Sequence, residues 1–441
     1  VMGTNRIILV GEGAKASIRT RNSALTPSEP AQRAGVNRLQ VPIQLPILLA
    51  GPVLRTVTSE SVTVWLATSV AVTIKATVYN ASDNSPLGSG SGDSVQLGER
   101  LFVHLVRIPA ADGYPVETLL AYNAEIELAP SAATVEFLGD VLLHPKEIAY
   151  FEQEMPTFYV AKPEAVTKYF LHGSCRKLHG AGSDATVQID RLLAFNATSL
   201  PARPSAIFLT GDQICADDVA PAVLLSASAL GREMLGWDER LPGFEDRIAA
   251  IGFGPRSKIR DFGFTVEEPD AKGHLLGFCD FIGMYVLAWN PDIWPWIRQA
   301  FPKLSQAAAA ETTHPAIRRA LANVACYMQF DDHEVTDDWN INSKWMRDTD
   351  NLTAGLVIAH GLAAFWAFQG IGNPLGGRDA PLRSAIESYV QGKGKDPESF
   401  VSQVLGFHDW YYTAPTFPPA IVLDTRTMRD FAEISGEANP A

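Results

Sequence analysis

Residues 206–218 read Ala-Ile-Phe-Leu-Thr-Gly-Asp-Gln-Ile-Cys-Ala-Asp-Asp, a short apolar run that ends in a glycine and an acidic turn. A short apolar run bounded by turn residues is typical of a strand that is buried on both faces of a sheet. Gly211 lets the backbone turn sharply where the run ends, so that Asp212 projects from the end of the strand. The stretch therefore predicts a strand of a parallel sheet with a carboxylate at its carboxyl end.

The preceding segments extend this prediction to a strand–helix–strand unit. Tyr169–Cys175 reads as a buried strand that ends in a loop. A helix is expected to begin near Ser183 or Asp184, either of which can cap it, and to end at about Asn196. Two strands joined by such a helix are expected to be parallel. Further along the chain we expect two more buried strands and a helix: Val324–Phe330, Ala420–Asp424 and Thr353–Phe368.

The chain before residue 164 has a different pattern, with short alternating segments in place of long apolar runs. Strands are expected at Ser61–Ala67, Thr73–Tyr79, Leu101–Ile108 and Leu119–Leu128. Asn80–Gly98 is rich in Asn, Asp, Ser and Gly and is expected to be a turn. The spacing predicts an all-β N-terminal domain, an immunoglobulin- or fibronectin-like β-sandwich over 47–163 with Trp65 in its core. Residues 1–46 are expected to form an N-terminal arm.

The bulk composition limits the classes of function. A chain of 441 residues is long enough for two or three domains. Its net charge of −13 argues against wrapping nucleic acid, which requires clustered Lys and Arg. The apolar run Phe278–Trp289 contains Asp280 and is shorter than the ~20 residues of a membrane span, so no span is expected. No secretory signal is recognised, which favours a cytoplasmic over a periplasmic or exported protein while the possibility of a removed leader stays open.

Polar side chains follow directly on the predicted strands of the second half. Loops that leave the carboxyl ends of parallel strands converge on one crevice, so Cys175, Asp212 and the Asp331–His333 cluster are expected to lie close together. The carboxylate of Asp212 can bridge two cations. The alternative is that residues 211–218 form a solvated acidic turn before the next helix.

Asp331–Glu334 is the densest polar cluster. Three carboxylates around an imidazole are costly after a buried strand unless water or a cation compensates them. Carboxylates suit hard cations, and imidazole suits iron, zinc or manganese. His333 is alternatively a general acid that protonates a leaving oxygen, and the whole cluster is alternatively an acidic surface loop. Asp337 and Asp338 extend the acidity, and Trp339 is expected to shield it from water.

Two further segments leave their chemistry open. Arg176 and Lys177 follow Cys175 and would favour its thiolate, which can be a nucleophile or a metal ligand. A thiol hydrolase that pairs Cys175 with a histidine is therefore an alternative mechanism, without a local signature. Asp424–Thr427 is either a ligand-bearing turn or a place where Arg426 pairs with a buried acid.

Together these segments resemble the alkaline phosphatase D (PhoD-like) metallophosphatase family over about residues 47–430. The resemblance lies in Gly173-Ser-Cys-Arg176, Leu209–Asp218, Phe330–Trp339 and Pro418–Arg426, and in the sandwich start Gly51–Arg55 with Val62–Trp65. It implies a β-sandwich followed by a calcineurin-like α/β/β/α metallophosphatase domain, here over 164–441. It also implies hydrolysis of phosphate monoesters and diesters by a metal-bound hydroxide, with iron and calcium as cofactors and zinc or manganese as alternatives.

The resemblance also implies roles for single residues. Cys175 and Asp212 correspond to iron ligands, with Asp212 bridging to calcium, and Asp338 lies where the family has a further polar ligand. Asp331 and Cys215 belong to the same metal set. His333, Asp332 and Arg176 are the residues expected to act on the phosphate ester.

Two departures from the family pattern bear on activity. The family has Tyr where this chain has Cys215, a softer ligand that would change metal preference or form a disulfide with Cys175. The family takes later ligands from a Gly-Asp-x-His segment, whereas no histidine follows His408. The catalytic domain is therefore expected to be partial, with a second polypeptide or chain segment completing the metal site. The leading hypothesis is a metal-dependent phosphoesterase, and the alternative is a catalytically inactive structural or binding subunit of a larger assembly.

Overall fold

The computed structural model describes residues 6–10, 43–128, 134–135, 148–162, 169–180, 182–302 and 304–431. The strands are β1 (Arg6–Val10), β2 (Leu48–Val57), β3 (Ser61–Thr68), β4 (Val72–Asn80), β5 (Pro86–Gly98), β6 (Leu101–Pro109), β7 (Leu119–Leu128), β8 (Thr134–Val135), β9 (Thr157–Tyr159), β10 (Phe170–Ser174), β11 (Ala206–Thr210), β12 (Ala325–Gln329), β13 (Tyr412–Ala414) and β14 (Ala420–Val422). The helices are α1 (Val187–Phe195), α2 (Pro221–Leu235), α3 (Glu268–Ala271), α4 (Phe278–Trp289), α5 (Trp294–Ala300), α6 (Ser305–Ala322), α7 (Ser343–Asp348), α8 (Leu352–Phe368), α9 (Ala380–Gln391) and α10 (Pro397–Leu405). Short 3₁₀ helices are η3 (Ile248–Ala250), η4 (Pro255–Phe262), η5 (Asp332–Glu334) and η6 (Gly370–Gly372).

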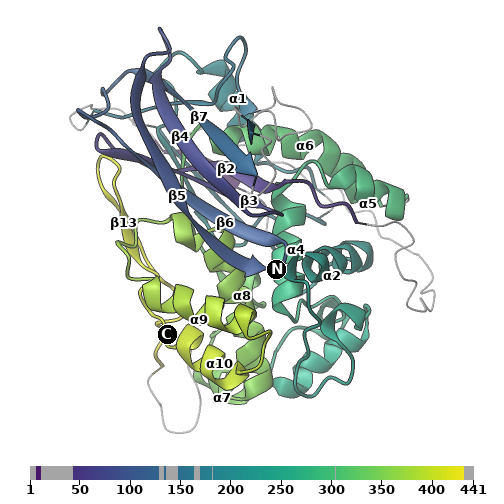
Figure 1. The fold of residues 1–441 in the computed structure, drawn as a ribbon. Coiled ribbons are helices and arrows are strands. Elements are labelled where there is room, and N and C mark those ends of the chain that lie inside the picture. Colours follow the sequence, from purple (N-terminus) through teal and green to yellow (C-terminus); the bar gives the residue numbers. More distant parts are fainter. Residues whose placement is uncertain are drawn as a thin grey trace.

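The protein is a mixed α/β structure whose N-terminal region, from β2 to β9, is an antiparallel sheet. Strands β2 to β9 form one eight-stranded sheet in the order β2-β3-β6-β5-β4-β7-β8, with β9 also on β7. In Figure 1 the blue strands β4 to β6 lie above the yellow helices α9 and α10. The strands predicted at Ser61–Ala67, Thr73–Tyr79, Leu101–Ile108 and Leu119–Leu128 are confirmed as β3, β4, β6 and β7.

The prediction of a turn over Asn80–Gly98 is wrong for most of its length, because Pro86–Gly98 forms β5. The first half of β5 pairs with β4, and its second half pairs with β6. Its small residues allow the close backbone approach that this change of partner requires. A Cβ at Gly90 would lie 2.1 Å from the carbonyl oxygen of Arg107. The glycines therefore serve the strand and do not break it.

Strands β2, β3 and β6 are covered on both faces. Val62, Val64 and Leu66 of β3 share an apolar cluster with side chains of β4 and β7. Trp65 points to the opposite face and contacts the rings of Trp289 and Phe368, with centroids 5.7 and 5.6 Å away. Its prediction as a core residue is confirmed, since it has no exposed surface.

The second sheet carries the parallel strands that the sequence predicts. Its order is β1-β10-β11-β12, with β10, β11 and β12 parallel and β1 antiparallel to β10. The βαβ unit and the strand at 324–330 are thus confirmed. Strand β1 lies within the predicted arm at 1–46, where no strand was expected; most of that arm lies outside the described residues. The boundary at 163–164 also lies outside them, so the domain limits stay predictions.

Three details differ from the sequence prediction or follow it closely. Helix α1 begins after Thr186, because Asp184 accepts a hydrogen bond from the Thr186 amide and holds the chain in a turn there.

The segment at 420–424 is not a buried strand of the parallel sheet. It forms β14, which pairs with β13 in a hairpin and leaves Ile421 73% exposed. The helix at 353–368 is confirmed as α8, whose side chains are almost all buried.

The apolar run at 278–289 forms the buried helix α4. Its Asp280 pairs with the equally buried Arg256, with Nη1 and Oδ2 2.5 Å apart. Within the described residues, no helix combines the length and apolar character that a membrane crossing requires.

Candidate metal centre

Three loops at the carboxyl ends of β10, β11 and β12 carry the candidate site. Cys175 and Asp212 have left-handed backbones, with φ of 57° and 51°. The Cys175 amide donates to the Gly211 carbonyl at 3.1 Å, and the Arg176 amide donates to the Asp212 carbonyl at 2.6 Å. The predicted convergence of these loops is therefore confirmed.

Gly211 brings the loops after β11 and β12 into direct contact. Its φ is +122°, and a Cβ at this position would lie 2.4 Å from the Cβ of Asp331. Only glycine adopts this backbone without strain and leaves room for Asp331. Asp212 is thereby turned toward the segment that begins at Asp331.

Glu334 connects the two loops and has no role in the sequence prediction. Its carboxylate accepts hydrogen bonds from the amides of Asp212, Gln213 and Asp331 at 2.7, 2.8 and 2.9 Å. It is completely buried. The sequence shows that residue 334 is an acid, but only the fold shows that its carboxyl group faces backbone N–H donors.

Two groups of ligand atoms meet at this edge of the sheet. Potential ligand atoms of Asp212, Asp332 and His333 all lie within 4.8 Å of one another. A second such group consists of Asp332, Asp337 and Asp338. Asp332 therefore belongs to both groups. The structure brings four of the predicted site residues together here: Asp212, Asp332, His333 and Asp338.

His333 is held by Asp217, a residue without an assigned role in the sequence prediction. The Nδ1 atom of His333 lies 2.7 Å from Asp217 Oδ1, and its amide donates to Asp212 Oδ1 at 3.1 Å. Burial lowers the pKa of His333, but Asp217, Asp212 and Asp332 outweigh it and raise that pKa to about 10. The ring is therefore protonated at neutral pH in the metal-free protein, and a cation at Nε2 would have to displace its proton.

Asp212 is the buried carboxylate of the group, with 1% of its surface exposed. Burial raises its pKa to about 7; His333 opposes this rise, and Asp332 and Asp331 add to it. The Cys175 thiol donates a hydrogen bond to Asp212 Oδ2 at 3.1 Å. Burial, followed by the charge of Asp212, raises the Cys175 pKa to about 12. The expected thiolate at Cys175 is therefore wrong for the metal-free protein.

The two basic residues after Cys175 pair with carboxylates and not with its thiol. Arg176 is buried; its Nε lies 2.8 Å from Asp184, and its Nη1 donates to the Ala288 carbonyl at 2.7 Å. Lys177 pairs with Asp218. In the metal-free protein Arg176, predicted to act on the substrate, is thus engaged in a buried ion pair with Asp184, and its role toward a substrate stays a prediction.

Cys215 is buried behind the acidic turn, and burial followed by the charge of Asp212 raises its pKa well above the usual value. Neither group of ligand atoms in the described residues includes Cys175 or Cys215. All four cysteines of the chain are free thiols, so the alternative of a disulfide between Cys175 and Cys215 is not realised.

Asp331 faces a guanidinium. Arg426 Nε donates to Asp331 Oδ1 at 2.6 Å, and Arg426 Nη2 lies 3.0 Å from Asp332 Oδ1. Asp424 instead accepts from the amides of Arg426 and Thr427 within its own turn. Of the two readings of Asp424–Thr427, the structure therefore favours the one in which Arg426 pairs with an acid. In the described part of the chain, neither group of ligand atoms includes Asp331.

The donor set fits a hard cation. Asp212 and Asp332 offer carboxylate oxygens, which suit calcium as well as smaller cations, and a deprotonated His333 would add an imidazole nitrogen, which suits manganese, iron or zinc. Trp339, 2% exposed, packs on Phe330 with ring centroids 5.5 Å apart, but it leaves Asp338 exposed, so the expected shielding from water does not extend to that acid. The iron and calcium implied by the resemblance are compatible with these oxygens, whereas the thiols contribute nothing to the two groups.

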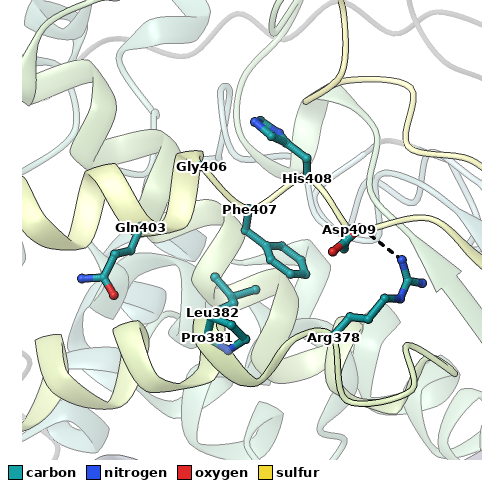
Figure 2. Close-up of a pocket in the computed structure, with 8 residues that line it drawn as sticks. All are labelled: Arg378, Pro381, Leu382, Gln403, Gly406, Phe407, His408 and Asp409. Carbon is teal, nitrogen blue, oxygen red and sulfur yellow. Dashed lines mark hydrogen bonds and ion pairs between the residues drawn. The ribbon is translucent and has the colours of Figure 1, made fainter.

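A hollow of about 360 Å³ lies elsewhere, between the start of α9 and the end of α10. Figure 2 shows the Phe407 ring beside Leu382, with the Arg378–Asp409 ion pair at one side and His408 above. None of the candidate metal ligands lines it. The hollow is therefore separate from the acidic groups.

No protein-family model and no curated protein matches this chain. The resemblance to PhoD-like metallophosphatases thus rests on its sequence motifs alone.

Proposed function

We propose that this protein is a metal-dependent phosphoesterase that hydrolyses phosphate monoesters or diesters. The observation that carries the proposal is the meeting of Asp212, Asp332 and His333 at the carboxyl ends of parallel strands, with ligand atoms within 4.8 Å of one another. Ligands commonly bind at this edge of a parallel sheet. The motif resemblance to PhoD-like enzymes supports the same function.

Asp212 and Asp332 would hold the first cation, and Asp332, Asp337 and Asp338 a second. A bound cation supplies Lewis acidity: it makes water more acidic and offsets the charge on phosphoryl oxygens. The resemblance favours iron and calcium, with zinc or manganese as alternatives. The net charge of −13 does not exclude a phosphorylated substrate, because cations reverse the local field.

His333 holds the proton that a leaving oxygen needs. Asp217 binds Nδ1 of the ring at 2.7 Å, which fixes the ring orientation and stabilises the protonated form. Nε2 then carries a proton that can pass to the leaving oxygen of a phosphate ester.

The finer fold assignment belongs to the same proposal. The antiparallel sheet would be an immunoglobulin- or fibronectin-like β-sandwich at 47–163, and the parallel sheet with its helices a calcineurin-like metallophosphatase domain at 164–441. A cytoplasmic location, preferred over export, stays a prediction.

One observation favours the alternative of an inactive structural or binding subunit. Arg426 already pairs with Asp331 and Asp332, at 2.6 and 3.0 Å. A guanidinium that neutralises these carboxylates replaces part of the charge that a cation would offset. In that case the loops would be stable without metal.

Hydrolysis of p-nitrophenyl phosphate and bis(p-nitrophenyl) phosphate separates the two functions. Wild-type protein loaded with Mn²⁺, Fe²⁺ with Ca²⁺, or Zn²⁺ should release nitrophenol, and a chelator should stop it. Asp212→Asn should lower the rate at least about 100-fold, because loss of a direct ligand costs more than loss of a supporting residue. The exposed Asp350→Asn should retain full activity. Equal rates in wild type and Asp212→Asn, or no metal-dependent hydrolysis, would leave the inactive subunit as the better account.

A further inference from the structure

Glu334 is a buried carboxylate that faces hydrogen-bond donors on both oxygens. Its Oε2 accepts from the amides of Asp212 and Asp331, at 2.7 and 2.9 Å. Its Oε1 accepts from the Gln213 amide at 2.8 Å and from the Gln369 side-chain amide at 3.1 Å. One side chain therefore binds the loop after β11, the loop after β12 and the end of α8.

The contacts of Gln369 tie this arrangement to the rest of the molecule. Its Nε2 also donates to the Tyr285 hydroxyl at 2.9 Å, on α4. Its carbonyl accepts from Nη2 of the buried Arg55, on β2, at 2.7 Å. Glu334 is thus anchored to the helices and, through Gln369, to the antiparallel sheet. A carboxylate anchored in this way has little freedom to follow a loop that moves.

We propose that Glu334 is a positioning residue, which sets the distance between Asp212 and the Asp331–His333 segment so that both sides can bind one cation. This role rests on the proposed metal centre. The amides of Asp212 and Asp331 share a single oxygen atom, so the two loops cannot separate without breaking a buried hydrogen bond. Glu334 itself contributes no ligand atom to either group of the described residues.

Glu334→Gln is the sharpest substitution, because it keeps the size of the side chain and removes one acceptor oxygen. The new amide NH₂ would face two N–H donors in place of the acceptor that they need. With the NH₂ group at the Oε1 position, the Gln213 amide and the Gln369 side chain would lose their acceptor; with it at the Oε2 position, the amides of Asp212 and Asp331 would both lose theirs. Residues that support metal ligands typically change metal affinity by about 10–100-fold when altered.

Glu239 provides a matched control. It is also a buried carboxylate, and it accepts from the amides of Phe278 and Cys279 at 3.0 and 2.6 Å. These amides belong to the start of α4 and not to the two loops. Glu239→Gln should therefore lower the melting temperature as Glu334→Gln does, while it leaves metal affinity unchanged.

The test is a calorimetric titration of the full-length chain with Mn²⁺, for wild type, Glu334→Gln and Glu239→Gln. The proposal expects Mn²⁺ to bind about 10–100-fold more weakly to Glu334→Gln alone. Equal affinities in wild type and Glu334→Gln would overturn the positioning role and leave the metal centre intact. Absence of Mn²⁺ binding in wild type would overturn both.

Hydrogen exchange keeps the proposal testable should Glu334→Gln fail to fold. In wild-type protein the amides of Asp212, Gln213 and Asp331 should exchange as slowly as those of the buried strand β11. Fast exchange at these three amides would mean that Glu334 does not hold the loops, and would overturn the proposal.

Discussion

Arg426 and Asp331 form a close ion pair at the rim of the acidic groups: Nε donates to Oδ1 at 2.6 Å, and Nη2 lies 2.6 Å from the same oxygen. Only 9% of the Arg426 side chain is exposed. The pair assigns different roles to two adjacent acids. Asp331 neutralises a buried guanidinium, whereas Asp332 belongs to both groups of ligand atoms.

Substitution of each acid in turn separates these roles. Asp332→Asn should weaken Mn²⁺ binding at least about 100-fold, because a shared ligand is lost. Asp331→Asn should change Mn²⁺ affinity less than about 10-fold and lower the melting temperature instead, because Arg426 loses the nearer of its two carboxylate partners. Calorimetric titration and thermal unfolding of both variants measure the two effects. The reverse order of affinities would show that Asp331 is a ligand, as the motif resemblance implies.

Gly211→Ala tests the close contact between the loops. Alanine would have to adopt φ of +122° with its Cβ 2.4 Å from that of Asp331. We expect a loss of about 2 kcal/mol or more in the free energy of unfolding in urea. The control is Gly252→Ala, where no atom lies within 4 Å of the added Cβ. Equal stability of the two variants would mean that the loops are not in contact at Gly211.

The parallel sheet could be predicted from sequence because its strands are apolar runs that end at turn residues. Ala206–Thr210 followed by Gly211 carries both signals. Strand β5 could not be predicted in this way, because its glycines and serines give no apolar signal. They allow the close backbone approach to β6. The segment at 420–422 looked like a core strand, but local apolar content does not reveal that its partner is the short strand β13.

From the sequence, the position of the site could be predicted only by the rule that loops at the carboxyl ends of parallel strands lie close together. That principle brings Asp212 to Asp332 and His333 without any knowledge of side-chain direction. The direction of Arg176 depends on Asp184 and on the Ala288 carbonyl, which is 112 positions away in the chain. Such partners are set by tertiary packing and leave no local pattern in the sequence.

The metal-free protein should lose stability as the pH rises. The pKa of His333 is raised from 6.5 to about 10, so its stabilising proton is fully bound below pH 6.5 and is lost as the pH approaches 10. The pKa values of Asp212 and Glu334 are raised to about 7 and about 8, and these shifts have the same sign. The folded state therefore binds more protons than the unfolded state across this range. Urea unfolding in chelator from pH 5 to pH 10 measures the slope.

Asp217→Asn is the matched variant for that measurement. It removes the carboxylate that holds His333 Nδ1, so the His333 pKa should fall toward its usual value. NMR titration of the imidazole reports this directly, and the decline in stability above pH 7 should become shallower. An unchanged His333 titration in Asp217→Asn would contradict the assignment of Asp217 as its partner.

The buried pair of Arg256 and Asp280 should be critical for folding. Neither side chain is exposed, and Asp280 also accepts from the amide of Leu276 at 2.9 Å. Asp280→Ala leaves an uncompensated guanidinium and should cost about 3–5 kcal/mol in the free energy of unfolding. Asp348→Ala, which removes the exposed partner of Lys344, should cost no more than about 1 kcal/mol. Similar losses in the two variants would contradict the burial of the Arg256 pair.

Anomalous diffraction from a crystal soaked in Mn²⁺ tests the metal centre most directly. We predict an anomalous peak in contact with carboxylate oxygens of Asp212 and Asp332, at about the 2.0–2.2 Å typical of small divalent cations, and none in an Asp332→Asn crystal. A peak at another place in the molecule, or no peak while Arg426 still holds Asp331 and Asp332, would contradict it.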